Sequence, residues 1–128
     1  AKHLFLDSAY YNTAKAKFRM TYKGQQDVYG AEAKYYEALI LYTMDSLDKC
    51  KKSITDFYHQ YPNYTYWLGK TFILLSDYYL KKGDEFQAKA TLNNVLENFE
   101  EQEIKDIARQ KLDAIEKKNS VTPNDSGD

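Results

Sequence analysis

The sequence predicts an all-α fold, in which antiparallel helix pairs stack into a right-handed superhelix that ends in a single capping helix. An internal repeat is the main reason: Cys50, Ile54 and Phe57, at positions i, i+4 and i+7, recur 38 positions later as Ala88, Leu92 and Val95. A fainter copy of the pattern starts 36 positions before Cys50. Gly and Pro are scarce and fall between the periodic segments. Self-similarity with a period of about 20–50 residues is typical of helical repeat arrays.

The first three helices are predicted from apolar residues that recur at helical spacing. They cover residues 10–23, 29–44 and 47–60. Asp45-Ser46 supplies a turn and an N-cap for the third helix, and Pro62 ends that helix because proline cannot continue the hydrogen-bond ladder. The three stripes are Tyr11, Ala14, Phe18 and Tyr22; Ala31, Tyr35, Ala38 and Tyr42; and Cys50, Ile54, Phe57 and Tyr61.

Three more helices are predicted over residues 65–82, 85–98 and 102–118. Gly83 is suited to a helix exit and Asp84 to the next N-cap. The last helix has apolar residues on one face and charges elsewhere, as a terminal repeat requires when only one of its sides is covered. The stripes are Trp67 or Leu68, Phe72, Leu75 and Tyr79; Ala88, Leu92, Val95 and Phe99; and Ile104, Ile107, Ala108, Leu112 and Ile115.

These helices divide one repeat domain, residues 1–118, into four parts. The parts are a partial repeat (1–28), two full repeats (29–64 and 65–100) and a capping helix (101–118). Residues 119–128 lack the apolar content that offsets the entropy of ordering, so we expect a disordered tail. The chain opens without Met at what looks like mid-helix, which indicates a piece of a longer protein.

Composition argues against several classes of partner. The 18 basic and 19 acidic residues give a formal net charge of −1, so no strong field attracts nucleic acid. No apolar run approaches the roughly 20 residues of a membrane span. Cys50 is the only cysteine and occupies a small core position of the repeat, which favours packing over a role as nucleophile.

The helix pairs resemble the tetratricopeptide repeat. The spacings of 36 and 38 residues depart from the usual period of about 34, and Glu100 stands where the proline of the last unit would be. The Tyr-rich style of residues 30–38 is similar to bacterial envelope-associated members of the family, which would place the chain on the periplasmic side, although its compartment is open. The matching residues are Ala38, Leu41, Cys50, Ile54, Phe57 and Pro62 in one unit, and Phe72, Leu75, Ser76, Tyr79, Gly83, Asp84, Ala88, Leu92 and Val95 in the next.

This resemblance implies a non-catalytic protein-interaction scaffold, which holds a peptide or helix of a partner protein in a concave groove. The alternative is a structural or self-associating spacer within a larger protein. In that case the chain could form a homo-oligomer. By analogy with the family, the groove is lined by Tyr35, Tyr36, Leu39, Tyr42, Lys70, Ile73, Asp77, Leu80, Lys81, Lys105 and Arg109.

Other sites find little support. His3 and His59 have no second ligand at metal-binding spacing, and phosphate loops and nucleophile elbows are absent, so we expect no enzyme, cofactor or metal. Leu39 and Asp77 stand where a carboxylate clamp of the family would need Asn, which argues against such a clamp. Residues 61–67 are either an aromatic binding loop or a corner between repeats.

Overall fold

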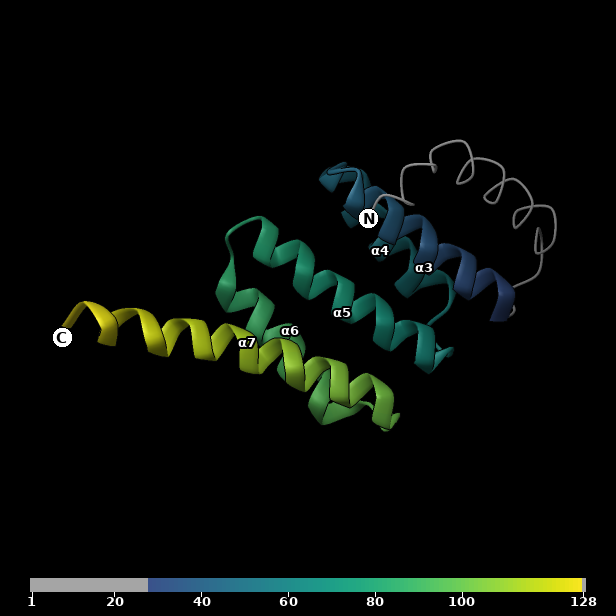
Figure 1. The fold of residues 1–128 in the computed structure, drawn as a ribbon. Coiled ribbons are helices and arrows are strands. Elements are labelled where there is room, and N and C mark those ends of the chain that lie inside the picture. The colour runs from purple at the N-terminus through teal and green to yellow at the C-terminus, as the bar shows by residue number, and fades with distance from the viewer. Residues whose placement is uncertain (1–27, 128) are drawn as a thin grey trace. The chain divides into compact units, whose positions relative to one another are not determined.

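The computed structural model describes residues 28–127, with side chains as far as Asn119. This part of the chain is all-helical and contains no strand, which confirms the all-α prediction (Figure 1). The predicted helix at 10–23, and with it almost all of the partial repeat, lies outside the described residues. The helices are α3 (Val28–Thr43), α4 (Leu47–Gln60), α5 (Thr65–Lys81), α6 (Glu85–Asn98) and α7 (Gln102–Gly127).

Four of these helices lie within one residue of their predicted bounds, and α4 and α6 agree at both ends. Helix α7 differs, because it continues to Gly127 where the sequence predicts an end near Lys118 and a disordered tail. Propagating an existing helix needs no new nucleation and adds one backbone hydrogen bond per residue, except at Pro123, which has no N–H to donate. A long helix can therefore continue through residues that would not start one.

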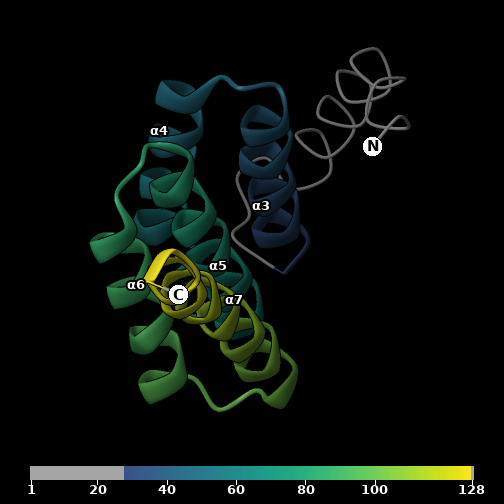
Figure 2. The same cartoon turned by 60° about the vertical axis from the view of Figure 1, so that its left-hand side comes forward.

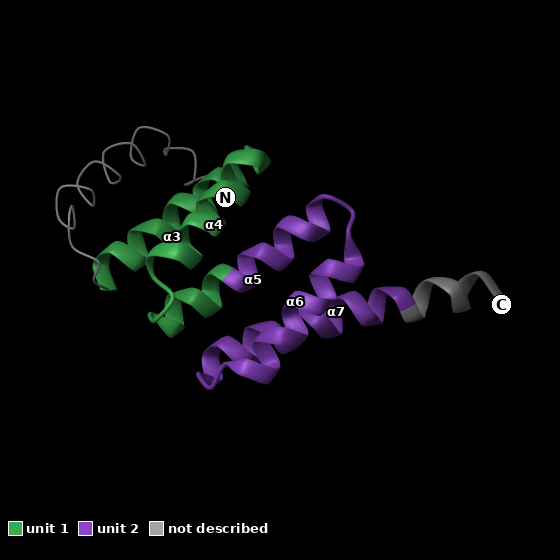
Figure 3. Ribbon diagram, turned by 180° about the vertical axis from the view of Figure 1, so that it is seen from behind, with its two compact units in different colours: residues 1–71 green, residues 72–128 purple. Residues whose placement is uncertain are grey.

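The chain divides into two compact units, residues 1–71 and 72–128 (Figure 3). The boundary falls inside α5, so this helix contributes to both units. The residues of α5 with less than one-tenth exposure lie all around the helix rather than on a single stripe: they are Gly69, Thr71, Ile73, Leu74, Leu75, Ser76 and Tyr78. A helix whose buried residues are not confined to one stripe packs on more than one of its sides.

In unit 1, α3 and α4 form a helical hairpin and run side by side (Figures 1 and 2). The turn between them includes Asp45 in the left-handed conformation, at φ 61°. Small side chains face the interior, because Ala31, Ala38 and Cys50 are 0–1% exposed. Their size allows the two helices to approach closely, and the larger Ile54 fills the remaining space at 0% exposure.

In unit 2, α6 packs against α7. Ala88, Leu92 and Val95 are each 0% exposed, as are Ile104 and Ala108 on α7. The six residues of the internal repeat are thus all buried to within 1%, which confirms that the repeated pattern is a packing pattern. As far as Asn119, the exposed side chains of α7 are polar except for Ala114, the outer face that a capping helix needs.

The helix ends show which capping signals operate. Asp84 accepts a hydrogen bond from the backbone N–H of Gln87 at 3.1 Å, as predicted for an N-cap. Gly83 has φ +80°, a conformation that favours glycine. Ser46 occupies the N-cap position of α4, as predicted, although its side chain makes no capping hydrogen bond. The Ser46 carbonyl instead accepts the N–H of Cys50 at 2.9 Å.

Among the described residues, none of the helices has the length and apolar character needed to cross a membrane.

Candidate functional site

Four aromatic side chains gather in unit 1, where the middle of α3 meets the first turn of α5. We refer to Tyr35, Tyr36, Tyr66 and Trp67 as the aromatic cluster. The Trp67 ring centroid lies 5.5 Å from that of Tyr35, 5.8 Å from Tyr36 and 4.9 Å from Tyr66. Tyr35 and Tyr36 meet edge to face at 5.1 Å. These are favourable aromatic separations, worth about 0.5–1.5 kcal/mol per pair beyond burial.

The local sequence explains why the cluster is only partly buried. Consecutive residues of a helix point about 100° apart, so Tyr35 turns inward at 8% exposure while Tyr36 remains 41% exposed. Trp67 and Tyr66 are both half-buried. The result is a continuous aromatic surface with one edge in the core and the other in water.

A cation borders the cluster. The Lys70 ammonium lies 5.6 Å from the centroid of the Tyr35 ring, within the range of a cation–π interaction. Lys70 is half-buried, and three positions after Trp67 it lies on the same side of α5. Apolar rings beside a positive charge suit a partner segment that offers apolar surface and an acceptor group.

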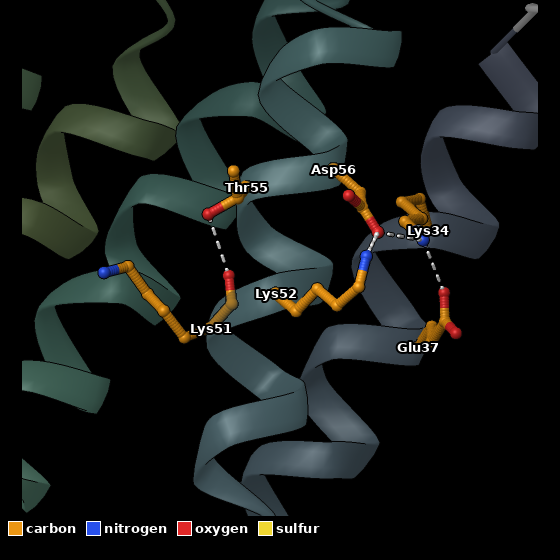
Figure 4. A network of polar contacts seen from close by, with 6 residues as sticks. All are labelled: Lys34, Glu37, Lys51, Lys52, Thr55 and Asp56. Atoms are coloured by element: carbon orange, nitrogen blue, oxygen red, sulfur yellow. Dashed lines mark hydrogen bonds and ion pairs between the residues drawn. The ribbon is translucent and has the colours of Figure 1, made fainter.

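A network of charges holds α3 in place beside the cluster (Figure 4). Lys34, which precedes Tyr35, donates to Glu37 at 3.0 Å and lies 3.6 Å from Asp56 on α4. Lys52 lies 3.4 Å from the same Asp56 oxygen. The Lys34 side chain is only 13% exposed, so these contacts are less screened by water than those of a surface pair. They fix the register of α3 against α4, and with it the direction of Tyr35.

Unit 2 contains a second group of interest, an ion pair between α5 and α7. The Lys111 ammonium donates to both carboxylate oxygens of Asp77, at 3.1 and 3.3 Å. Burial raises the pKa of Asp77, and the charge and hydrogen bond of Lys111 oppose that rise. The stability of the ionised Asp77 carboxylate therefore depends on the neighbouring Lys111.

This ion pair was not predicted from the sequence. Lys105 and Arg109 are the α7 residues predicted to line a groove with Asp77, yet Lys111 is the α7 residue that reaches it. Lys105 lies about 120° around the helix from Lys111, on the other flank of the buried stripe, and Arg109 about 160°. The spacing offered one signal for the pair, since Lys111 follows Asp77 by 34 residues, the usual period of the family.

The other predicted groove residues differ widely in exposure. Ile73 is only 6% exposed, so it fills the core and cannot line an open surface. Its assignment to a groove is wrong, because it lies among the buried residues of α5. The structure brings Tyr35, Tyr36 and Lys70 together within unit 1 and places Asp77 in the ion pair of unit 2. Leu39, Tyr42 and Lys105 are half-buried, whereas Leu80, Lys81 and Arg109 are exposed.

Residues 61–67 contribute both to the core and to the aromatic cluster. Tyr61 is 1% exposed, with its ring centroid 5.6 Å from Phe57 and 5.9 Å from Tyr64. Tyr66 and Trp67 belong to the cluster. The start of this segment is thus a corner packed into the core, and its end is the half-exposed surface.

The single thiol is poorly suited to chemistry. Cys50 is 0% exposed, and burial raises its pKa to about 11. A thiol that stays protonated at neutral pH is a weak nucleophile. Within residues 28–119, the His, Cys, Asp and Glu side chains form no group of three that could hold a metal ion, and His3 lies outside the described residues.

No family model, curated protein or solved structure matches this chain.

Proposed function

We propose that the chain is a non-catalytic scaffold that binds a peptide or helix of a partner protein, and that the aromatic cluster with Lys70 forms part of the binding surface. The observation that supports this proposal is the half-exposed arrangement of Tyr36, Tyr66 and Trp67 around the more deeply buried Tyr35. Tyr and Trp dominate the binding energy of protein interfaces because they bury much area at little entropic cost.

The helix pairs support the same proposal at the level of architecture. Small residues at Ala38, Cys50 and Ala88 allow close helix packing, as in the tetratricopeptide repeats that the sequence resembles. In repeat arrays of this kind, the side chains that leave the core on one face of successive helices form a binding surface. Tyr36 and Lys70 are side chains of this type on α3 and α5.

The test compares two tyrosines of one helix. Tyr36→Ala removes the exposed member of the cluster, and Tyr29→Ala removes an exposed tyrosine of α3 that is not part of the cluster, at 58% exposure. Proteins retained from a lysate of the native source by the wild-type domain are identified by mass spectrometry, and the purified partner is then titrated while the fluorescence of Trp67 is recorded. An interface hot spot of about 2 kcal/mol predicts a loss of affinity of roughly 30-fold for Tyr36→Ala.

Equal affinities of the two variants would exclude the aromatic cluster as the binding surface. A structural or self-associating role is the second candidate, because Val28 and Tyr29 of α3, and Met44 directly after it, are also 45–58% exposed. Sedimentation velocity over a range of concentrations tests it. A mass that rises with concentration, together with an empty capture, would favour the spacer over the scaffold.

A further inference from the structure

Hydrogen-bond donors predominate among the polar groups at the aromatic cluster. The Trp67 indole N–H and the Lys70 ammonium can only donate, whereas the Tyr36 hydroxyl can donate or accept. Tyr36 is 41% exposed, and Trp67 and Lys70 are half-buried. Within residues 28–119, these three side chains make ring and cation–π contacts but no hydrogen bond. A partner that presents acceptors would therefore meet donors that the fold does not use.

The rings of the cluster are inclined to one another rather than stacked. The planes of Tyr36 and Trp67 differ by 58°, and those of Tyr66 and Trp67 differ by 86°. In tilted and edge-to-face pairs, the neighbouring ring does not cover every ring face. The partly exposed members of the cluster thus retain aromatic surface against which an apolar ring of a partner can pack.

An extended, proline-rich segment matches both features. In the polyproline II conformation no backbone carbonyl is bonded within the segment, so all carbonyls are available as acceptors. An α-helix, by contrast, uses all but its last carbonyls within its own backbone. Proline rings pack against aromatic side chains, and this mode of recognition recurs in several classes of peptide-binding domain. The proline segment is also ordered before it binds, which reduces the entropic cost of binding.

The charges beside the cluster differ on its two sides. On α5, Lys70 lies about 60° around the helix from Trp67 and about 40° from Tyr66, between the two rings and one turn further along. On α3, Glu32 precedes Tyr36 by one turn and lies on the same side of that helix. The surface is therefore positive on the α5 side and negative on the α3 side. A carboxylate of a partner is favoured only on the α5 side.

We propose that the aromatic cluster binds a proline-rich segment of the partner protein in the polyproline II conformation, with an acidic residue of that segment placed at Lys70. The Trp67 indole N–H and the Tyr36 hydroxyl donate to carbonyls of the segment, and its proline rings pack on the inclined aromatic rings. This inference rests on the proposed function, because it names the partner of the same surface. It narrows that function from any peptide or helix to an extended segment.

Three synthetic peptides without aromatic residues test the proposal. The first is a proline oligomer with one central glutamate, and the second has glutamine in place of that glutamate. The third is an amphipathic helical peptide of alanine and leucine that also carries one glutamate. Trp67 is the only tryptophan of the chain, so its fluorescence reports binding at the cluster. Isothermal titration calorimetry detects binding at any surface.

We expect the proline peptide with glutamate to bind, and Tyr36→Ala to weaken that binding by about tenfold. Phe86→Ala, which removes an aromatic ring of α6 that is 78% exposed, is the control and should leave the affinity unchanged. The glutamine peptide should bind about threefold more weakly, as expected for the loss of an exposed ion pair. Lys70→Gln should abolish this difference and Lys70→Arg should preserve it, with circular dichroism to check that all variants remain helical.

Three results would contradict the proposal in different ways. Tyr36-dependent binding of the helical peptide alone would overturn it and leave the proposed function intact. Proline peptides that produce neither heat nor a fluorescence change would also overturn it, and capture from the lysate would then decide the proposed function separately. Equal affinities for the glutamate and glutamine peptides would exclude the acidic residue at Lys70.

Discussion

Replacing Ala88 by Arg should destroy the packing of unit 2. Ala88 is 0% exposed on α6, which packs against α7, where Ala108 is also 0% exposed. An arginine at this position would either bury an unpaired charge or force the two helices apart. Leaving a charge uncompensated in a protein interior costs about 3–5 kcal/mol, a large part of the roughly 5–15 kcal/mol that stabilises a domain.

The same helix provides the control. Ala90 is exposed, two residues further along α6, and Ala90→Arg should change the free energy of unfolding by no more than about 0.5 kcal/mol. Ala88→Leu, which adds bulk without charge, should lie between the two at about 1–3 kcal/mol.

Urea unfolding followed by circular dichroism measures all three variants. We expect the midpoint to decrease in the order Ala90→Arg, Ala88→Leu, Ala88→Arg, with the last variant unfolded or nearly so in the absence of urea. If Ala88→Arg and Ala90→Arg had the same midpoint, the packing of α6 in this register would be refuted.

Three further predictions concern polar groups in the interior. The Ser53 hydroxyl is buried and has no hydrogen-bond partner, so Ser53→Ala should raise the free energy of unfolding by about 1 kcal/mol in urea titrations; a loss would mean that the hydroxyl is satisfied in solution. Because the folded-state pKa of Asp77 is raised, the wild type loses stability as pH rises through that pKa. Asp77→Asn should therefore be more favourable relative to the wild type at neutral pH than near pH 4, in unfolding titrations at both values; the reverse order would show that the attraction of Lys111 outweighs burial. The Cys50 thiol, with a pKa of about 11, should resist iodoacetamide at neutral pH and become modified in step with unfolding, as measured by mass spectrometry; rapid modification of the folded protein would contradict its burial.

Much of the core could be predicted from periodicity alone. Cys50, Ile54 and Phe57 repeat as Ala88, Leu92 and Val95, and a repeat of this kind survives only where each copy packs in the same way. The helix ends at Pro62, Gly83 and Asp84 could also be predicted from the sequence. Each of these residues affects only the backbone next to it, so its effect does not depend on tertiary packing.

The candidate site was harder to predict because it depends on which face of each helix meets which neighbour. An error of one residue turns a helix by about 100°, and the predicted groove residues of α7, Lys105 and Arg109, did not include Lys111, the partner of Asp77. Ile73 was misplaced for a related reason, since the buried residues of α5 are not confined to one stripe. Tyr35, by contrast, was predicted on the apolar stripe with Ala31 and Ala38, and its 8% exposure confirms that placement.

The boundary between the two compact units determines how this chain can be divided or recombined. A cut between Thr71 and Phe72 would leave seven residues of α5 with one fragment and ten with the other. Helices shorter than about 12–15 residues are only marginally stable by themselves in water. Each fragment would therefore lose a stable helix that packs against its core. Segments exchanged between related chains should be joined at the turns, such as Asp45-Ser46 or Gly83-Asp84. The interchangeable module is a whole helix with its flanking turns, not the compact unit.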